Sequence, residues 1–169
     1  MPATRLHLAV QYATDLDAPA RAQVRRWVHA ALTVAHGAAR EHRHRSIDDA
    51  TLTIRYVDAD EGRMLNRSYR GKDHATNVLT FSYEVAGRAV ESDLVICMPV
   101  VIAEARAQRK DLWAHCAHLV IHGTLHACGY DHELSSDADA MEAIERAVLA
   151  RFRIDDPYRT AHRRSLPDD

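Results

Sequence analysis

Two hydrophobic patterns alternate along the chain, and each predicts a different kind of element. Short apolar stretches, the first of them with the strict alternation of a half-buried strand, predict four strands at residues 5–12, 51–58, 77–83 and 92–98. Apolar residues at helical spacing predict helices at residues 18–37, 58–70, 99–128 and 135–152. The third helical stretch is expected to break near Lys110, because Asp111 can cap the start of a new helix. We therefore predict an α+β (mixed α/β) protein in which a four-stranded mixed β-sheet packs against about five helices.

The length of 169 residues suits one domain with a sizeable core. We predict a single domain over residues 1–154 and a flexible C-terminal tail over residues 155–169. No stretch approaches the ~18 apolar residues of a membrane span, and the first residues lack the apolar stretch of a signal peptide. The three cysteines lack the CxxC spacing of a structural zinc site and do not pair evenly, which fits a reducing compartment. A cytoplasmic protein without membrane contacts is the prediction.

The charge balance gives no general attraction to a polyanion. The chain has 22 Lys+Arg against 24 Asp+Glu, a formal net charge of -2. Any nucleic-acid site must therefore be a local patch. The compositional anomaly is the 12 histidines, since histidine is the side chain that most readily titrates or binds metal near neutral pH.

Three of these histidines have a spacing that suits a metal ion. His122 and His126 lie four residues apart on a predicted helix, so their imidazoles share one face. Gly129 can take the left-handed conformation that ends a helix and reverses the chain, which would bring His132 back toward the other two. The sequence therefore predicts three nitrogen ligands at the end of a central helix, with a fourth position for water. His118 and His122 satisfy the same spacing, but no glycine turn and third histidine follow that pair directly.

Metzincin peptidases share this ligand spacing, but in them a glutamate general base follows the first histidine. The corresponding residue here is Gly123, which cannot accept a proton. A metal at this site still lowers the pKa of a bound water toward ~7 and polarises a substrate oxygen. Asp131 can orient a ligand, act as a base or cap the turn, and the sequence does not decide between these roles.

Two stretches resemble the YbeY-type endoribonucleases of bacterial ribosomal RNA maturation: "HGTLHACGYDH" at 122–132 and "LNRSYRGKDHATNVLTFSY" at 65–83. The resemblance implies that His122, His126 and His132 bind zinc and that Arg70 is needed for activity. It also implies cleavage of single-stranded RNA and contact with the small ribosomal subunit. The sequence departs from the family pattern at Thr80 (usually Ser), Ser82 (usually Pro) and Ser92 (usually Gly), and none of these is a predicted ligand.

The leading hypothesis is a zinc-dependent, single-strand-specific endoribonuclease with one Zn²⁺ per chain. Its expected role is 16S rRNA 3′-end processing, ribosome maturation and quality control, with single-stranded RNA, ribosomal RNA and small-subunit proteins as partners and no DNA. A basic cluster supports a phosphate-containing substrate, because guanidinium groups can hold phosphate oxygens in pairs; it comprises Arg63, Arg67, Arg70 and Lys72. Two alternatives stay open: a metzincin-like metallopeptidase, and a non-catalytic ribosome-assembly factor that zinc only stabilises.

Overall fold

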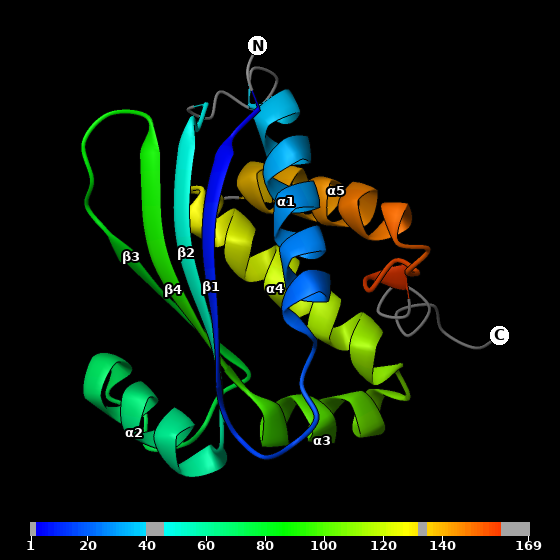
Figure 1. Ribbon diagram of the computed structural model, residues 1–169. Helices are drawn as coiled ribbons and strands as arrows, with labels where there is room; N and C mark the ends of the chain where they lie inside the picture. The colour runs from blue at the N-terminus through cyan, green and yellow to red at the C-terminus, as the bar shows by residue number, and fades with distance from the viewer. Residues whose placement is uncertain (1–2, 40–45, 132–134, 160–169) are drawn as a thin grey trace, which may run out of the picture.

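A four-stranded sheet separates the helices into two groups in the computed structural model, which describes residues 3–39, 46–131 and 135–159 (Figure 1). The strands are Arg5–Ala13 (β1), Asp49–Val57 (β2), Val78–Tyr83 (β3) and Ala89–Cys97 (β4). The helices are Arg21–Ala38 (α1), Ala59–Arg70 (α2), Met98–Gln108 (α3), Leu112–Ala127 (α4) and Ser135–Arg151 (α5). The predicted α+β class, with four strands and five helices, is confirmed. The predicted boundary at residue 154 stays a prediction.

The sheet has the strand order β1-β2-β4-β3. The first three of these strands run parallel, and β3 pairs antiparallel with β4 at one edge. Successive side chains of a strand point to opposite faces, so β4 contributes to two separate cores. Leu94 and Ile96 join the main core beneath α1, α4 and α5. Val95 and Cys97 join a smaller core that includes Leu65 of α2. Figure 1 shows α4 between the sheet and α5, with α2 on the opposite side of the sheet.

Both ends of α4 are fixed by local contacts that the sequence predicted. Asp111 caps the N-terminus, since its side chain accepts a hydrogen bond of 2.9 Å from the backbone N–H of Ala114. Beyond the C-terminus, Gly129 has a φ of +96° and lies in the left-handed region. The reversal it allows lets the N–H of Tyr130 donate to the carbonyl of Leu125 at 3.1 Å. The predicted helix break and the predicted glycine turn are therefore confirmed.

At Gly123, α4 packs tightly against the sheet. A Cβ atom built at this position would lie 2.5 Å from Cδ2 of Leu94, far inside van der Waals contact. The absence of a side chain thus has a packing reason, because any larger residue must displace a fully buried leucine. A glutamate, as found at this position in metzincins, does not fit between α4 and β4.

Replacing Gly123 by alanine tests this close approach. We expect Gly123→Ala to lower the free energy of unfolding by about 1 kcal/mol, because overpacking costs ~1–3 kcal/mol and the better helix propensity of alanine returns ~1 kcal/mol. Gly37→Ala is the matched control, since nothing lies within 4 Å of a Cβ built there in α1. Urea denaturation should show destabilisation at Gly123 and stabilisation at Gly37. Stabilisation of similar size at both positions would contradict the packing.

Two departures from the family pattern are partners across the sheet. Ser82 of β3 lies opposite Ser92 of β4, and their hydroxyl oxygens are 3.0 Å apart. Ser92 is buried, so its hydroxyl needs a hydrogen-bond partner. The hydroxyl of Ser82 supplies one, and the two unusual residues therefore satisfy each other without disturbing the strand pairing.

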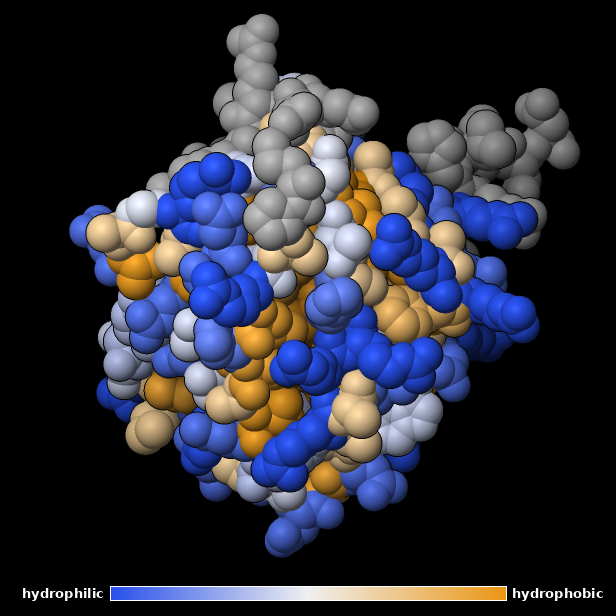
Figure 2. All heavy atoms as spheres, turned by 45° about the horizontal axis from the view of Figure 1, so that its top comes forward, coloured by the Kyte–Doolittle hydropathy of each residue, from blue (hydrophilic) through white to orange (hydrophobic). Residues whose placement is uncertain are grey.

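The surface mixes polar and apolar residues. Figure 2 shows, on the face turned toward the viewer, a band of hydrophobic residues between hydrophilic side chains. Within the described ranges, no helix has both the length and the hydropathy needed to cross a membrane.

Candidate metal centre

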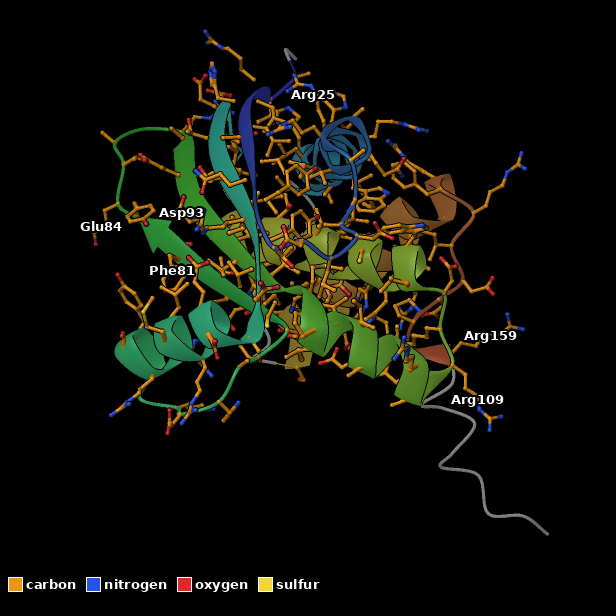
Figure 3. All side chains as sticks on the ribbon, turned by 60° about the horizontal axis from the view of Figure 1, so that its bottom comes forward. Arg25, Phe81, Glu84, Asp93, Arg109 and Arg159 are labelled. Atoms are coloured by element: carbon orange, nitrogen blue, oxygen red, sulfur yellow. The ribbon has the colours of Figure 1, made fainter. Side chains whose placement is uncertain are left out.

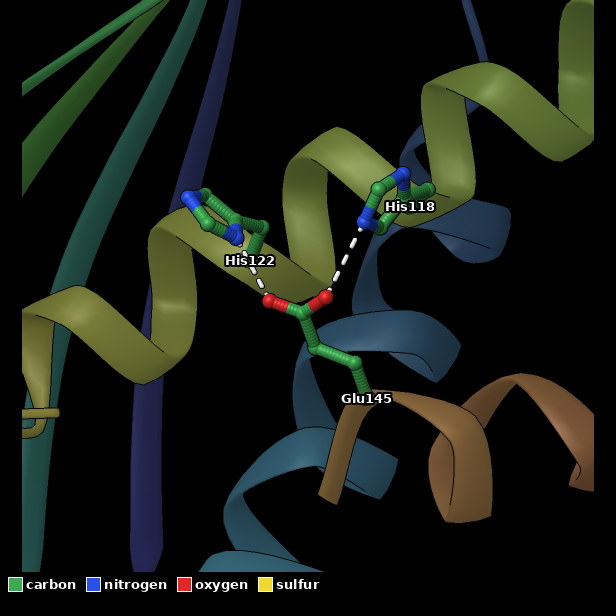
Figure 4. A group of neighbouring side chains, drawn as sticks. All are labelled: His118, His122 and Glu145. Atoms are coloured by element: carbon green, nitrogen blue, oxygen red, sulfur yellow. Dashed lines mark hydrogen bonds and ion pairs between the residues drawn. The ribbon is translucent and has the colours of Figure 1, made fainter. Parts of the chain in front are cut away.

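A buried carboxylate joins two histidines where α5 crosses α4 (Figure 4). His118 and His122 lie one turn apart on α4, and Glu145 reaches them from α5. Oε1 of Glu145 lies 2.5 Å from Nδ1 of His122, and Oε2 lies 3.0 Å from Nε2 of His118. The hydroxyl of Tyr158 also donates to Oε2. The Glu145 side chain is completely buried, and both of its oxygens therefore have partners within the protein.

The partners of Glu145 decide its charge. Burial by itself raises the pKa of this carboxyl. Hydrogen bonds from His118 and His122, the electrostatic interaction with His122 and the Tyr158 hydroxyl outweigh burial and lower the pKa to about 2. Glu145 is therefore an ionised acceptor at neutral pH, and it holds a proton on Nδ1 of His122.

The second nitrogen of His122 faces another histidine. Its Nε2 lies 3.0 Å from Nε2 of His126, and the two rings are nearly perpendicular, with centroids 4.5 Å apart. Because Glu145 fixes the proton of a neutral His122 on Nδ1, the lone pair of His122 lies on Nε2. Two imidazole ligands of a tetrahedral zinc ion, each at ~2.0–2.1 Å, have nitrogens roughly 3.3 Å apart. The geometry of this pair therefore fits two ligands of one metal ion.

The structure also brings together a different group that could hold a metal ion. It consists of His118, His122 and Glu145, whose donor atoms lie within 4.8 Å of one another. Both Glu145 oxygens already accept hydrogen bonds, an arrangement typical of a carboxylate that orients a metal-binding histidine from behind. We therefore favour Glu145 as a support for His122. The third predicted ligand, His132, lies outside the described residues and stays a prediction.

Sequence reasoning missed Glu145 and Tyr158, and it gave His118 no role. One signal for Glu145 was present in the sequence. Met141 and Leu149 lie one turn before and one turn after it on α5, and both are buried. An acid in the apolar stripe of a helix is costly to bury unless it is paired, so its position indicated a buried partner. The identity of that partner depends on the crossing of α5 over α4, which no local pattern reveals.

Arg70 lies on the other side of the sheet from the histidines, in the last turn of α2. It lines a groove of about 710 Å³ between α2 and the sheet. The structure thus brings His122 and His126 together on α4, which contacts the edge strand β3 from one face. Arg70 lines the groove on the opposite face of β3. The predicted basic cluster is only partly available for phosphate, because Arg63 forms two hydrogen bonds of 2.8 Å with Asp73. This ion pair also lowers the pKa of the Asp73 carboxyl.

The fold and the site define a class: an α+β protein whose central helix carries a histidine group, backed by a buried glutamate, that could hold a metal ion. A family model described as "Endoribonuclease YbeY" matches residues 11–153. The chain belongs to this YbeY endoribonuclease family, which confirms the resemblance of its two motifs.

Relatives named "Endoribonuclease YbeY" support this assignment. The one from Thiobacillus denitrificans is 51% identical over 158 residues, which cover 92% of this chain and 98% of the relative. The one from Cupriavidus pinatubonensis is 52% identical over 145 residues, 85% of this chain, and the match spans only 65% of that longer relative. The solution structure of TM1509 from Thermotoga maritima has a TM-score of 0.55 and 22% identity, and the match covers 86% of this chain and 91% of that one. This last likeness concerns the fold alone.

Proposed function

We propose that the chain is a zinc-dependent endoribonuclease that cuts single-stranded RNA at a site formed by His122, His126 and His132. The observation that carries the proposal is the pair of facing Nε2 atoms on His122 and His126, with Glu145 bonded behind His122. Membership of the YbeY endoribonuclease family supports the reaction class. We further propose one Zn²⁺ per chain and a cytoplasmic role in 16S rRNA 3′-end processing and ribosome quality control, together with small-subunit proteins.

Each residue has a separate task in the proposed reaction. When bound, zinc supplies a Lewis acid and an activated water molecule. Glu145 keeps His122 in the tautomer whose Nε2 carries the lone pair that would bind the ion. The guanidinium of Arg70 neutralises the phosphate oxygens as negative charge builds up on them. The general base stays unassigned.

Gly123 argues against the metallopeptidase alternative. The metzincin glutamate has no room at this position, because even a Cβ would collide with Leu94. A peptidase would need an acid from elsewhere, such as Asp131. The alternative of a non-catalytic assembly factor predicts zinc binding and ribosome binding without any RNA cleavage.

Turnover of three substrates under one condition separates these functions. Zinc-loaded protein is incubated with unstructured RNA, with duplex RNA of the same sequence, and with casein. We expect cleavage of the unstructured RNA alone. Casein turnover that a chelator abolishes, with RNA intact, would establish the peptidase. No turnover of any substrate by a zinc-loaded, folded protein would favour the assembly factor.

The role of Arg70 is tested by its removal. We expect Arg70→Ala to lower kcat for RNA cleavage by about 100-fold, since one lost donor to a developing oxyanion typically has this effect. Arg70→Lys should recover part of the loss, because it restores the charge without the paired donors. Zinc content should stay at the wild-type level in both. Arg106→Ala is the control, because Arg106 is an exposed arginine of α3 that does not line the groove, and an equal loss of kcat in this variant would contradict a specific role for Arg70.

A further inference from the structure

The groove beside Arg70 is built from one face of α2 and one face of the sheet. Glu61, Leu65 and Tyr69 recur every fourth residue, so they line the groove from a single face of the helix. Alternate residues of β1, β2 and β4 form its floor, and the consecutive residues 80–83 extend it across the edge strand β3. We call this the aromatic groove; its lining residues are Gln11, Thr53, Arg55, Glu61, Leu65, Tyr69, Arg70, Thr80, Phe81, Ser82, Tyr83, Asp93 and Val95.

Two tyrosines in the aromatic groove are exposed yet held in place. Tyr69 is 68% exposed and meets Phe81 edge to face, with ring centroids 4.7 Å apart. Figure 3 shows Phe81 between β3 and α2. Tyr83 is 50% exposed, and its hydroxyl donates a 2.6 Å hydrogen bond to Asp93. Rings that are ordered before a ligand arrives lose little side-chain entropy on binding, which favours stacking against a flat partner.

The charges of the aromatic groove leave one cation available. Glu61 is paired with Arg55 through hydrogen bonds of 2.9 and 3.3 Å, and Asp93 accepts from Tyr83. Among the lining residues, all of which the structure describes, Arg70 is the cation for which no ion pair or hydrogen bond forms. Its guanidinium can therefore hold a phosphate, while the acids of the groove are already engaged. Exposed aromatic rings next to an unpaired arginine are the combination that binds single-stranded nucleic acid.

The aromatic groove and α4 contact the edge strand β3 from opposite faces. Thr80 lines the groove, and its Oγ1 would lie 3.7 Å from a Cβ at Gly123 of α4. Gly123 directly follows His122 in the chain. β3 therefore lies between the groove and α4, and an RNA strand that leaves the groove around this edge comes to α4.

We propose that the aromatic groove binds the unpaired bases of single-stranded RNA, with Tyr69 and Tyr83 as stacking platforms and Arg70 on the adjoining phosphate. The inference rests on the proposed endoribonuclease function and extends it to how the substrate is recognised. Bases within a duplex are stacked on each other and cannot place their faces on these rings. The groove therefore selects for single strands and leads them around β3 toward His122.

Binding to metal-free protein tests the groove without cleavage of the probe. The full chain is treated with chelator, and the affinity for a fluorescein-labelled oligouridylate is measured by anisotropy. We expect Tyr69→Ala and Tyr83→Ala each to weaken binding by about tenfold, the usual effect of losing one stacked base. Tyr83→Phe keeps the ring and should recover most of the loss. Met64→Ala is the matched control, because Met64 is 56% exposed on the same helix and does not line the groove.

An abasic oligonucleotide of equal length separates stacking from general damage. It should bind the wild-type protein and the tyrosine variants with the same low affinity. Unchanged affinity for oligouridylate in both alanine variants would overturn the proposed role of the groove. A loss of affinity for the abasic oligonucleotide as large as the loss for oligouridylate would also overturn it. The same holds if the binding of an extended peptide depends on Tyr69 and Tyr83 and the binding of RNA does not. If zinc-loaded wild type fails to cleave RNA, the proposed function fails; if it cleaves and the tyrosine variants bind normally, only the groove fails.

Discussion

Glu145→Ala should lower the free energy of unfolding by about 3 kcal/mol. The change removes a fully buried carboxylate and leaves His118, His122 and Tyr158 without their common acceptor. Removing one partner of a buried charged interaction typically lowers the free energy of unfolding by ~3–5 kcal/mol. Because the two histidines are partly exposed, we expect a value at the lower end of this range. Urea denaturation of the metal-free protein measures the effect.

Glu142→Ala is the matched control for this prediction. Glu142 lies on the same helix, but its side chain is partly exposed and pairs with Arg146 at the surface. We expect it to change stability by less than about 1 kcal/mol. If Glu145→Ala does not fold, Glu145→Gln replaces it, with an expected loss of ~10–100-fold in zinc affinity measured by chelator competition. Equal stability of Glu145→Ala and Glu142→Ala, together with unchanged zinc affinity in Glu145→Gln, would contradict the supporting role of Glu145.

His126→Ala should abolish zinc binding and reduce RNA cleavage by at least about 100-fold. The change removes one of two facing Nε2 atoms. Loss of a residue that merely orients a ligand already lowers metal affinity or activity by ~10–100-fold, and loss of the ligand itself should have a larger effect. Because His126 is only partly buried, the fold should survive the substitution. Metal content per chain and the cleavage rate are measured on the same preparation.

His29→Ala provides the control for His126→Ala, because His29 is an exposed histidine of α1. It should bind zinc and cleave RNA like the wild-type protein. A His126→Ala protein that retains a full complement of zinc would show that the ligands are the other group, His118, His122 and Glu145. Retained cleavage would remove His126 from the reaction.

The elements were predictable from sequence because their signals are local. The spacing of hydrophobic residues, the cap at Asp111 and the turn at Gly129 each depend on a few neighbouring residues. The cap and the turn are both present in the structure. The strand order was not predictable in the same way. The placement of β3 at an edge, antiparallel to β4, depends on contacts between segments far apart in the chain, which hydrophobic period does not encode.

The candidate site shows the same division. The pair of His122 and His126 follows from a spacing of four on one helix. Glu145 lies 23 residues after His122, and Tyr158 lies 40 residues after His118. Only the docking of α5 and of the segment that follows it brings these residues to the histidines. The aromatic groove likewise combines one face of α2 with four strands. Arg70 was recognised through a family motif, whereas its neighbours Tyr69 and Tyr83 acquired a role only from their exposure.

Removal and return of zinc tests the proposed activity most directly. The cleavage rate of an unstructured RNA is measured on purified protein, on the same protein after complete removal of metal, and again after one equivalent of zinc is added. We predict that cleavage disappears with the metal and returns with zinc in the wild-type protein, but does not return in His126→Ala. Cleavage that persists without metal, or that zinc fails to restore to a folded wild-type protein, would contradict a zinc-dependent endoribonuclease.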